Sequence, residues 1–297
     1  MAEPAPFTVE SFQTSDGYRL QYRRYVNAAT DGQASALAHV VCLHGIQSHA
    51  GWYEHSSRKL SEAGFIVSFL DRRGSGMNKE ARGDAPSFRR LLQDVAEFLE
   101  HLRKAMDTAS PAQPIFLIGI SWGGKVAAAL TRFQPRHISG IVLLSPGFCP
   151  LVRPPRSERL RIAWARLVSP QRLFAIPLND PQLFTSTPKW LDFLRGDSLS
   201  LHRASARFLV ESVRLDRYLK SVPAHVRVPV LLMLAGKDRI IDNAATRRFV
   251  EKFAAPDRQV IEYPAAHHTL EFEPDPHCFL VDLIAWLRQH ASPAARS

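Results

Sequence analysis

A serine flanked by glycines is the first residue whose surroundings suggest chemistry. Gly119-Ile120-Ser121-Trp122-Gly123 follows an apolar run and precedes an alanine-rich stretch that ends near Phe133. Glycines are needed beside a sharp strand-to-helix turn, where a Cβ atom would clash with neighbouring backbone. Such a turn raises a serine hydroxyl above the sheet and directs the helix N-terminus towards it. The spacing therefore predicts a nucleophilic serine, Ser121, with a serine that merely caps the helix as the alternative.

A nucleophilic serine needs a general base, and the base needs an acid that orients it. After this kind of turn the acid should come next along the chain and the histidine last. Asp238 directly follows the apolar run 229–235 and is the candidate acid, whereas Asp242 fits the cap of a helix that begins near residue 243. His267 and His268 both lie in the loop after the last expected strand. Their spacing does not decide which of the two is the base.

Negative charge that develops on a substrate oxygen needs N–H donors. We expect one donor to be the backbone N–H of Trp122, the residue after the serine. The other should be the N–H of Ile46, in the loop after the run 39–43, where Gly45 lets the backbone turn inwards. His44 precedes that loop, and we expect it to hold the loop in place. The residues together predict acyl transfer through serine, which requires no metal and no organic cofactor.

The elements around these residues predict a doubly wound α/β fold. Apolar, strand-like runs alternate with helix-like stretches up to residue 147 and again from about residue 226. Between them, residues 148–225 contain amphipathic helical pieces and no convincing strand. We therefore expect residues 1–147 and 226–297 to form the sheet domain. Residues 148–225 would form a helical cap over the carboxyl ends of the strands, where ligands bind in open α/β sheets.

The middle of the chain is strongly basic. The net charge is +10, and residues 148–228 hold 14 Lys or Arg against 6 Asp or Glu. A solvated basic surface and contact with an anionic membrane both fit this excess, whereas no motif favours nucleic acid. Three scattered cysteines lack metal-ligand spacing and are expected to be reduced, mostly buried thiols. Without a signal-like start or an apolar run of about 18 residues, we expect a soluble, cytoplasmic protein.

The motifs together resemble the α/β-hydrolase superfamily, from about Phe7 to His290. The segments "LHGIQSHAGWYEH", "DRRGSGMN", "GISWGGK" and "GKDRIID" look like the monoacylglycerol lipase and lysophospholipase branch, often grouped with serine aminopeptidases. The resemblance implies an eight-stranded, mostly parallel sheet with helices on both faces and a helical cap. It also identifies His268 as the base, because Tyr263, Ala266, His268 and Leu270 match that branch's pattern.

The resemblance implies a serine hydrolase that cleaves medium-to-long acyl esters such as monoacylglycerol or lysophospholipid. Five aromatic side chains are candidates for its substrate pocket: Trp52, Tyr53, Phe148, Phe184 and Trp190. A peptidase similar to proline iminopeptidases is an alternative, although its usual oxyanion loop differs from "HGIQS". A cofactor-free haloperoxidase or carbon–carbon bond hydrolase would keep the same triad. The alternative from another class is a non-catalytic ligand-binding protein of this fold.

Overall fold

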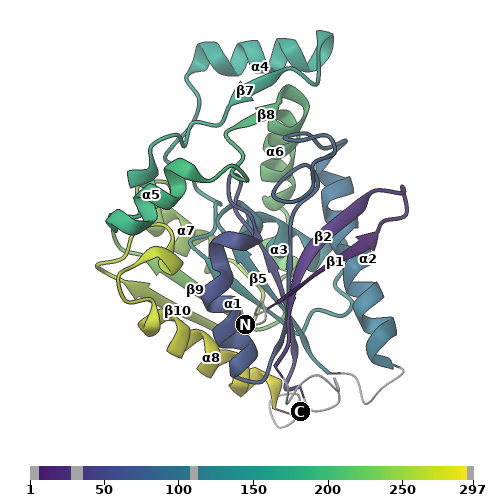
Figure 1. Ribbon diagram of the computed structural model, residues 1–297, viewed down its shortest axis with the longest axis vertical. Helices are drawn as coiled ribbons and strands as arrows, with labels where there is room; N and C mark the ends of the chain where they lie inside the picture. The colour runs from purple at the N-terminus through teal and green to yellow at the C-terminus, as the bar shows by residue number, and fades with distance from the viewer. Residues whose placement is uncertain (1–6, 28–35, 108–112, 293–297) are drawn as a thin grey trace, which may run out of the picture.

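The centre of the molecule is a twisted sheet of eight strands (Figure 1). The computed structural model describes residues 7–27, 36–107 and 113–292, and these ranges contain all the elements named below. The strand order is β1-β2-β4-β3-β5-β6-β9-β10. The strands are β1 (Thr8–Gln13), β2 (Arg19–Tyr25), β3 (His39–Leu43), β4 (Ile66–Leu70), β5 (Ile115–Ile120), β6 (Gly140–Leu144), β9 (Val230–Ala235) and β10 (Arg258–Tyr263).

The sheet is parallel except at one edge, where β1 pairs with β2 and β2 pairs with β4 in antiparallel fashion. Every residue of β3, β4, β5, β6 and β9 is buried. Strands covered on both faces need continuous apolar runs, and the sequence shows such runs here. The parallel strands end at one edge of the sheet, and this edge carries the loops that hold the candidate chemistry.

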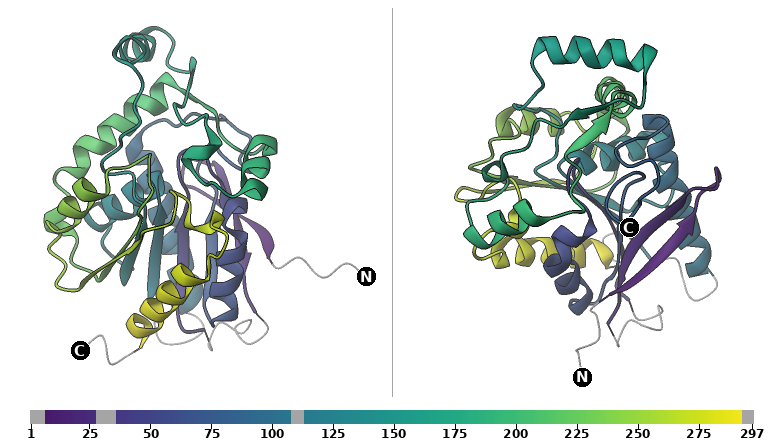
Figure 2. Two further views of the ribbon diagram at one scale, coloured as in Figure 1. Left: turned by 90° about the vertical axis from the view of Figure 1, so that its left-hand side faces the viewer. Right: turned by 45° about the horizontal axis from the view of Figure 1, so that its top comes forward.

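Helices cover both faces of the sheet (Figures 1 and 2). Helices α1 and α8 pack together, and α2 and α3 form another contacting pair. Trp286 of α8 packs edge-on against Phe116 of β5, with ring centroids 5.8 Å apart. The helices of the sheet region are η1 (Ala50–Tyr53), α1 (Glu54–Glu62), α2 (Phe88–Asp107), α3 (Trp122–Phe133), η3 (Pro223–His225), α7 (Asn243–Val250), η4 (Leu270–Phe272) and α8 (His277–Ala291).

The chain between β6 and η3 lies over the carboxyl edge of the sheet, with α4 farthest from it (Figure 1). Its elements are α4 (Arg156–Val168), β7 (Leu173–Ala175), η2 (Pro181–Leu183), α5 (Pro188–Gly196), β8 (Arg203–Ser205) and α6 (Ala206–Leu219). The helices agree with the sequence pattern, but the expectation of no strand is wrong, because β7 and β8 form an antiparallel pair. Three-residue strands are too short to show a two-residue periodicity.

Two further expectations concern the burial of the cysteines and the presence of a helix long enough to cross a membrane. Cys42 is buried and Cys149 is half-buried, but Cys278 is exposed, so the expected burial fails for one thiol. Among the helices in the described ranges, none combines the length and the apolar character needed to cross a bilayer.

Candidate functional site

Ser121 occupies a strained turn between β5 and α3. Its φ of 51° and ψ of −118° fall where a residue with a side chain pays about 1–3 kcal/mol. The turn is fixed by the end of β6, because the Ser121 N–H donates to the carbonyl of Leu144 at 2.9 Å. The Ser121 carbonyl accepts from the N–H groups of Gly124 at 3.0 Å and Gly147 at 2.8 Å. The predicted elbow geometry is therefore present at this serine.

The glycines around the turn are required by close backbone approaches. A Cβ on Gly119 would lie 2.6 Å from a backbone atom of α3, and a Cβ on Gly123 would lie 2.1 Å from the carbonyl oxygen of Leu43. A Cβ on Gly45 would lie 3.3 Å from the Cβ of Ser121. The first turn of α3 thus rests against the end of β3, and the loop after β3 passes next to the serine.

The loop after β3 is held by His44, which is buried. The backbone N–H of Arg72 can only donate, so the Nε2 of His44 accepts at 2.9 Å and the proton resides on Nδ1. Nδ1 then donates to the carbonyl of Gly45 at 2.7 Å. Burial lowers the pKa of His44 well below its ordinary value of 6.5, which keeps the ring neutral. These contacts agree with the structural role predicted for His44.

Arg72 supports the same loop, and its role was not predicted from the sequence. Its guanidinium donates to the carbonyls of Gly45 and Ile46, each at 3.1 Å. It also lies over the rings of Trp122, at 4.9 Å, and Phe208, at 5.0 Å. Burial lowers its pKa to about 9. The signal that could have revealed it is an arginine two residues after β4, the strand that pairs with β3.

Asp238 and His268 form a buried pair. The Nδ1 of His268 donates to Oδ2 of Asp238 at 2.6 Å, and their side chains are 3% and 0% exposed. The other carboxylate oxygen accepts from the backbone N–H groups of Ile240, at 2.8 Å, and Ile241, at 3.1 Å. The carboxylate is thus fixed on one side and orients the imidazole on the other. The Nε2 of His268 is buried and makes no hydrogen bond to any described residue, Ser121 included.

The neighbouring candidates have other partners. His267 faces Glu273, whose Oε1 lies 2.7 Å from its backbone nitrogen and 3.1 Å from its Nδ1. Asp242 caps α7, because its Oδ1 accepts from the N–H of Ala245 at 2.9 Å. The structure therefore pairs Asp238 with His268, and it confirms the capping role of Asp242.

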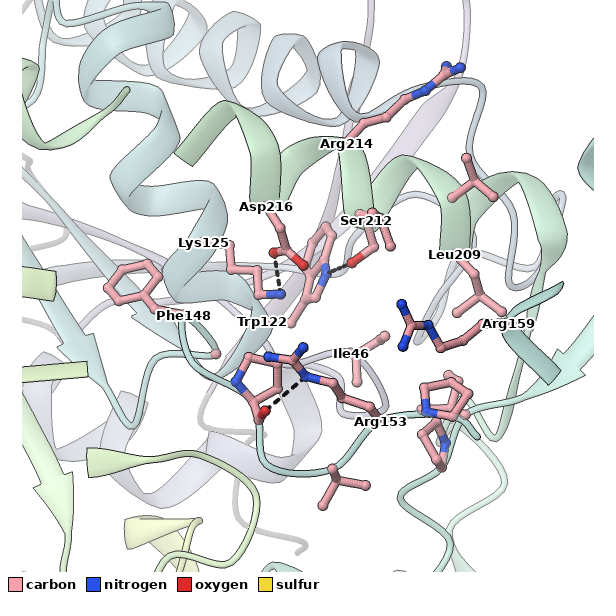
Figure 3. Close-up of a pocket in the computed structure, with 18 of the residues that line it drawn as sticks. Ile46, Trp122, Lys125, Phe148, Arg153, Arg159, Leu209, Ser212, Arg214 and Asp216 are labelled. Carbon is pink, nitrogen blue, oxygen red and sulfur yellow. Dashed lines mark hydrogen bonds and ion pairs between the residues drawn. The ribbon is translucent and has the colours of Figure 1, made fainter. Parts of the chain in front are cut away.

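Ser121, Ile46 and Trp122 line a cavity of about 1000 Å³ between the sheet edge and the α4 and α6 helices (Figure 3). Side-chain contacts tie α6 to α3 along its wall. The indole N–H of Trp122 donates to Ser212 at 2.9 Å, and the ammonium of Lys125 contacts Asp216 at 2.6 Å. This volume is at the upper end of the range of small-molecule pockets, roughly 300–1,000 Å³. The described residues include no group of three His, Cys, Asp or Glu arranged to hold a metal.

Of the five aromatic pocket candidates, only Phe148 lines this cavity. Trp52 packs against Phe184 and Phe272, with centroids 5.5 and 5.3 Å apart, and Trp190 stacks on Phe272 at 4.6 Å. Tyr53 stacks on Phe69 at 5.2 Å. Phe184 lies edge-on to His268 at 6.0 Å, so it covers the imidazole. Aromatic side chains pack into cores as readily as they line pockets, and sequence alone does not separate the two.

Residues 184–201, here called the α5 strap, connect to the histidine loop at one end. The Thr269 N–H donates to the carbonyl of Phe184 at 3.0 Å. The hydroxyls of Thr185 and Thr187 both donate to the carbonyl of Phe272, at 3.0 and 2.9 Å. The strap therefore fixes the loop that follows His268.

The other end of the α5 strap connects to the loop after β3. Asp197 is the centre of this connection, and its Oδ2 accepts from Nε2 of His49 at 2.9 Å and from the indole of Trp52 at 2.7 Å. The N–H of Leu201 donates to the carbonyl of Gln47 at 2.9 Å. Burial alone would raise the pKa of the Asp197 carboxyl, but the hydrogen bonds from His49, Ser200 and Trp52 outweigh this effect and hold the pKa below its usual range. One segment thus spans the expected oxyanion loop and the histidine loop.

Replacing Asp197 by alanine should misplace the loop that carries Ile46. A shift of about 1 Å at a reacting site costs up to about 10²-fold in rate, so we expect kcat to fall ten- to a hundredfold while KM changes little. The matched control is Asp192→Ala within α5, the helix for which Asp197 is the C-cap, since Asp192 is exposed and pairs only with Arg195 among the described residues. Equal kcat values for the two variants would contradict the positioning role of Asp197.

Glu271 should make stability depend on pH near neutrality. Burial raises its pKa from 4.5 to about 7, and its Oε1 accepts from the N–H of Ser56 at 3.0 Å. The folded state therefore holds the proton more tightly, so its contribution to stability is full below pH 4.5 and is lost as the pH rises through 7. We expect Glu271→Gln to raise the free energy of unfolding above pH 7 by about 1–3 kcal/mol, and to change it little at pH 4.5.

Denaturant unfolding at pH 4.5 and pH 8 checks this expectation. Glu251→Gln, which alters an exposed carboxylate, is the control. A difference between the native protein and Glu271→Gln that does not change with pH would contradict it.

Comparisons with known proteins identify the family. The family model described as serine aminopeptidase, S33, matches residues 34–275. A monoacylglycerol lipase of Mycolicibacterium smegmatis is 27% identical over 263 residues, which cover 84% of this chain and 88% of the relative. A phospholipase of Bacillus subtilis is 25% identical over 80% of this chain and 90% of the relative.

The fold matches solved structures across almost the whole chain. A soluble variant of a Saccharomyces cerevisiae monoglyceride lipase, in complex with a substrate analog, superposes with a TM-score of 0.84 at 20% identity, over 98% of each chain. A monoacylglycerol lipase of Paleococcus ferrophilus superposes with a TM-score of 0.79 at 23% identity, over 91% of this chain and 99% of that one. The fold and the family resemblance predicted from the sequence are both confirmed. This chain is thus an α/β hydrolase similar to the monoglyceride lipases, and it belongs to the serine aminopeptidase S33 family.

Proposed function

We propose that the protein is a serine hydrolase that cleaves carboxylic esters with medium-to-long acyl chains, such as monoacylglycerol or lysophospholipid. The observation that carries this proposal is the large cavity whose wall contains Ser121 and is otherwise built mainly from apolar side chains. Residues 148–225 act as the cap that closes this cavity over the sheet. The names of the lipase and phospholipase relatives support the same class of substrate.

The proposed reaction has two steps. His268 accepts the proton of Ser121 at its free Nε2 as the hydroxyl oxygen attacks the ester carbonyl. Asp238 keeps the proton of the ring on Nδ1 and stabilises the imidazolium. The N–H groups of Ile46 and Trp122 bind the oxyanion, the alcohol leaves with the proton, and water then releases the acyl group.

An ester fits the cavity better than a peptide with a free amine. Recognition of an α-ammonium group requires a carboxylate, and the one carboxylate among the described lining residues is Asp216. Asp216 is already paired with Lys125 at 2.6 Å. The peptidase alternative therefore lacks an amine partner in this cavity.

Hydrolysis of p-nitrophenyl esters from acetyl to palmitoyl tests the proposal, together with labelling by a fluorophosphonate probe. We expect labelling, and rates that rise from the short to the longer chains. Equal rates on acetyl and decanoyl esters would contradict the acyl-chain preference. Absence of both hydrolysis and labelling would contradict the serine hydrolase and favour a ligand-binding protein.

We also propose that α4 contacts an anionic membrane. Four apolar side chains form one stripe on its surface, at 73%, 65%, 77% and 60% exposure: Leu160, Trp164, Leu167 and Val168. The helix forms the end of the molecule opposite the sheet and also carries four arginines (Figure 2). An exposed amphipathic helix with arginines suits the surface of an anionic bilayer.

Co-sedimentation with vesicles of phosphatidylglycerol and phosphatidylcholine measures this contact. We expect binding that weakens with salt and is lost in Trp164→Glu. The control is Val281→Glu on α8, where an exposed apolar side chain lies far from α4 (Figure 1). No binding of the native protein at low salt would contradict membrane contact.

A further inference from the structure

The cavity that contains Ser121 carries an excess of positive charge. Its lining includes seven Lys or Arg side chains and one carboxylate. Lys125 is balanced by that carboxylate, on Asp216, and Arg214 is balanced by Glu211, each pair at 2.6 Å. The remaining five cations form no ion pair with any described residue, so the cavity retains a net positive charge that the protein does not compensate.

Two of these cations extend into the cavity from the cap. Figure 3 shows Arg153 and Arg159 reaching into the space in front of Ile46 and Trp122, whereas Arg214 points away from it. Arg153 uses its Nε on the carbonyl of Pro150, at 3.1 Å, which fixes the side chain and leaves its terminal nitrogens available. No hydrogen bond or ion pair of the Arg159 side chain occurs within the described ranges.

The position of Arg159 is unfavourable for the helix itself. It lies in the first turn of α4 with Arg156, where the positive end of the helix dipole disfavours cations by about 0.3–1 kcal/mol each. Arginines there add to the dipole field, and the carboxylate of the same turn, Glu158, is paired with Arg161 at 2.7 Å. An anion in the cavity would relieve both the dipole and the uncompensated guanidinium charge.

We propose that the substrate is an acyl ester that also carries an anionic group, a phosphate or a carboxylate, which Arg153 and Arg159 bind. This inference rests on the proposed ester hydrolysis and narrows its substrate class. Guanidinium groups bind both anions through paired N–H donors, and a partly enclosed, mainly apolar site strengthens such contacts. A neutral glyceride of the same acyl chain would leave the two arginines without a partner.

Three octanoyl esters, used below their micelle concentrations, test the proposal without an interface. They are octanoylglycerol, octanoylglycerol phosphate and the octanoyl ester of glyceric acid. We expect kcat/KM for at least one anionic ester to exceed that of the neutral ester about tenfold, which corresponds to one good charged contact. A higher value for the phosphate or for the carboxylate ester identifies the anion.

Charge-removing variants locate the contact. Arg153→Gln and Arg159→Gln should each lower kcat/KM on the preferred anionic ester about tenfold and change kcat/KM on octanoylglycerol far less. The matched control is Arg161→Gln, since Arg161 lies on the same helix, pairs with Glu158 at 2.7 Å and does not line the cavity. If Arg161→Gln lowers the rate equally, the basic cap attracts anionic esters through its overall charge, and the proposed anion site is wrong.

Binding separates this inference from the proposed function. Calorimetry with octyl phosphate and octanoate, on the native protein and both variants, measures the anion site without any turnover. Hydrolysis of the neutral ester at least as fast as both anionic esters overturns the anion site and leaves ester hydrolysis standing. If no ester is cleaved but octyl phosphate or octanoate binds in an Arg159-dependent way, the anion site stands and the proposed reaction fails.

Discussion

Replacing Ser121 by alanine is expected to lower ester hydrolysis by about 10⁴-fold or more and to abolish labelling by fluorophosphonates. The proposed mechanism passes through a covalent bond to the Ser121 hydroxyl, so no residual route uses the same chemistry. Alanine keeps the Cβ atom, and the turn with φ of 51° carries the same backbone strain in the variant. Stability should therefore stay nearly unchanged, and activity and thermal unfolding are measured on the same preparation.

Two controls separate the chemistry from the local structure. Ser145→Ala removes another buried hydroxyl on a residue with positive φ, 41°, and should leave the rate within a few-fold of the native value. His268→Ala should be about as inactive as Ser121→Ala, because residues that act as one unit fail together. His267→Ala should retain activity, since its ring faces Glu273. An active Ser121→Ala, or a loss confined to His267→Ala, would refute the assignment.

Replacing Gly123 by alanine is expected to destabilise the fold by about 3 kcal/mol or more. The new Cβ would lie 2.1 Å from the carbonyl oxygen of Leu43 and 2.7 Å from that of His44. Both are backbone atoms at the end of β3, so the steric clash can be relieved only if α3 and β3 move apart. That movement would displace Trp122 and the loop containing Ile46, and activity should be lost along with stability.

Denaturant unfolding measures this loss of stability. The control is a substitution at a glycine that has free space around it. Gly196 ends α5, and a Cβ placed there meets no atom within 4 Å. Gly196→Ala should therefore change the free energy of unfolding by no more than about 0.5 kcal/mol. Unfolding of Gly123→Ala at the same denaturant concentration as the native protein would contradict the close packing of α3 on β3.

The sheet and the elbow could be predicted because their signals are local in the sequence. The apolar run before Ser121 and the glycines around it directly encode a buried strand, a tight turn and a packed helix. The fold followed from the alternation of such runs, and it is confirmed. The pairing of Asp238 with His268 rather than His267 needed the family resemblance, because adjacent residues in one loop give no periodicity that separates them.

The contacts of the cap could not be predicted in the same way. Asp197 meets His49 across 148 positions of the chain, and no local pattern records such a contact. Trp52, Phe184 and Trp190 were expected to line the pocket, but Trp52 and Trp190 pack on Phe272. Phe184 packs against Trp52 and His268. An aromatic side chain suits both a pocket wall and a packed core. Which of the two it occupies here depends on how the α5 strap lies over the sheet edge. The roles of the site residues in catalysis stay predictions that the variants above test.

The α5 strap also limits how this protein can be re-engineered. A cap fastened only at its two chain connections could be exchanged between relatives as one cassette. Here the exchange of residues 148–225 would remove the partners of Thr269, Gln47 and His49 at once. Altered selectivity is therefore more accessible through point changes along α4 than through grafting of a foreign cap, and α5 is the part that such a library should leave untouched.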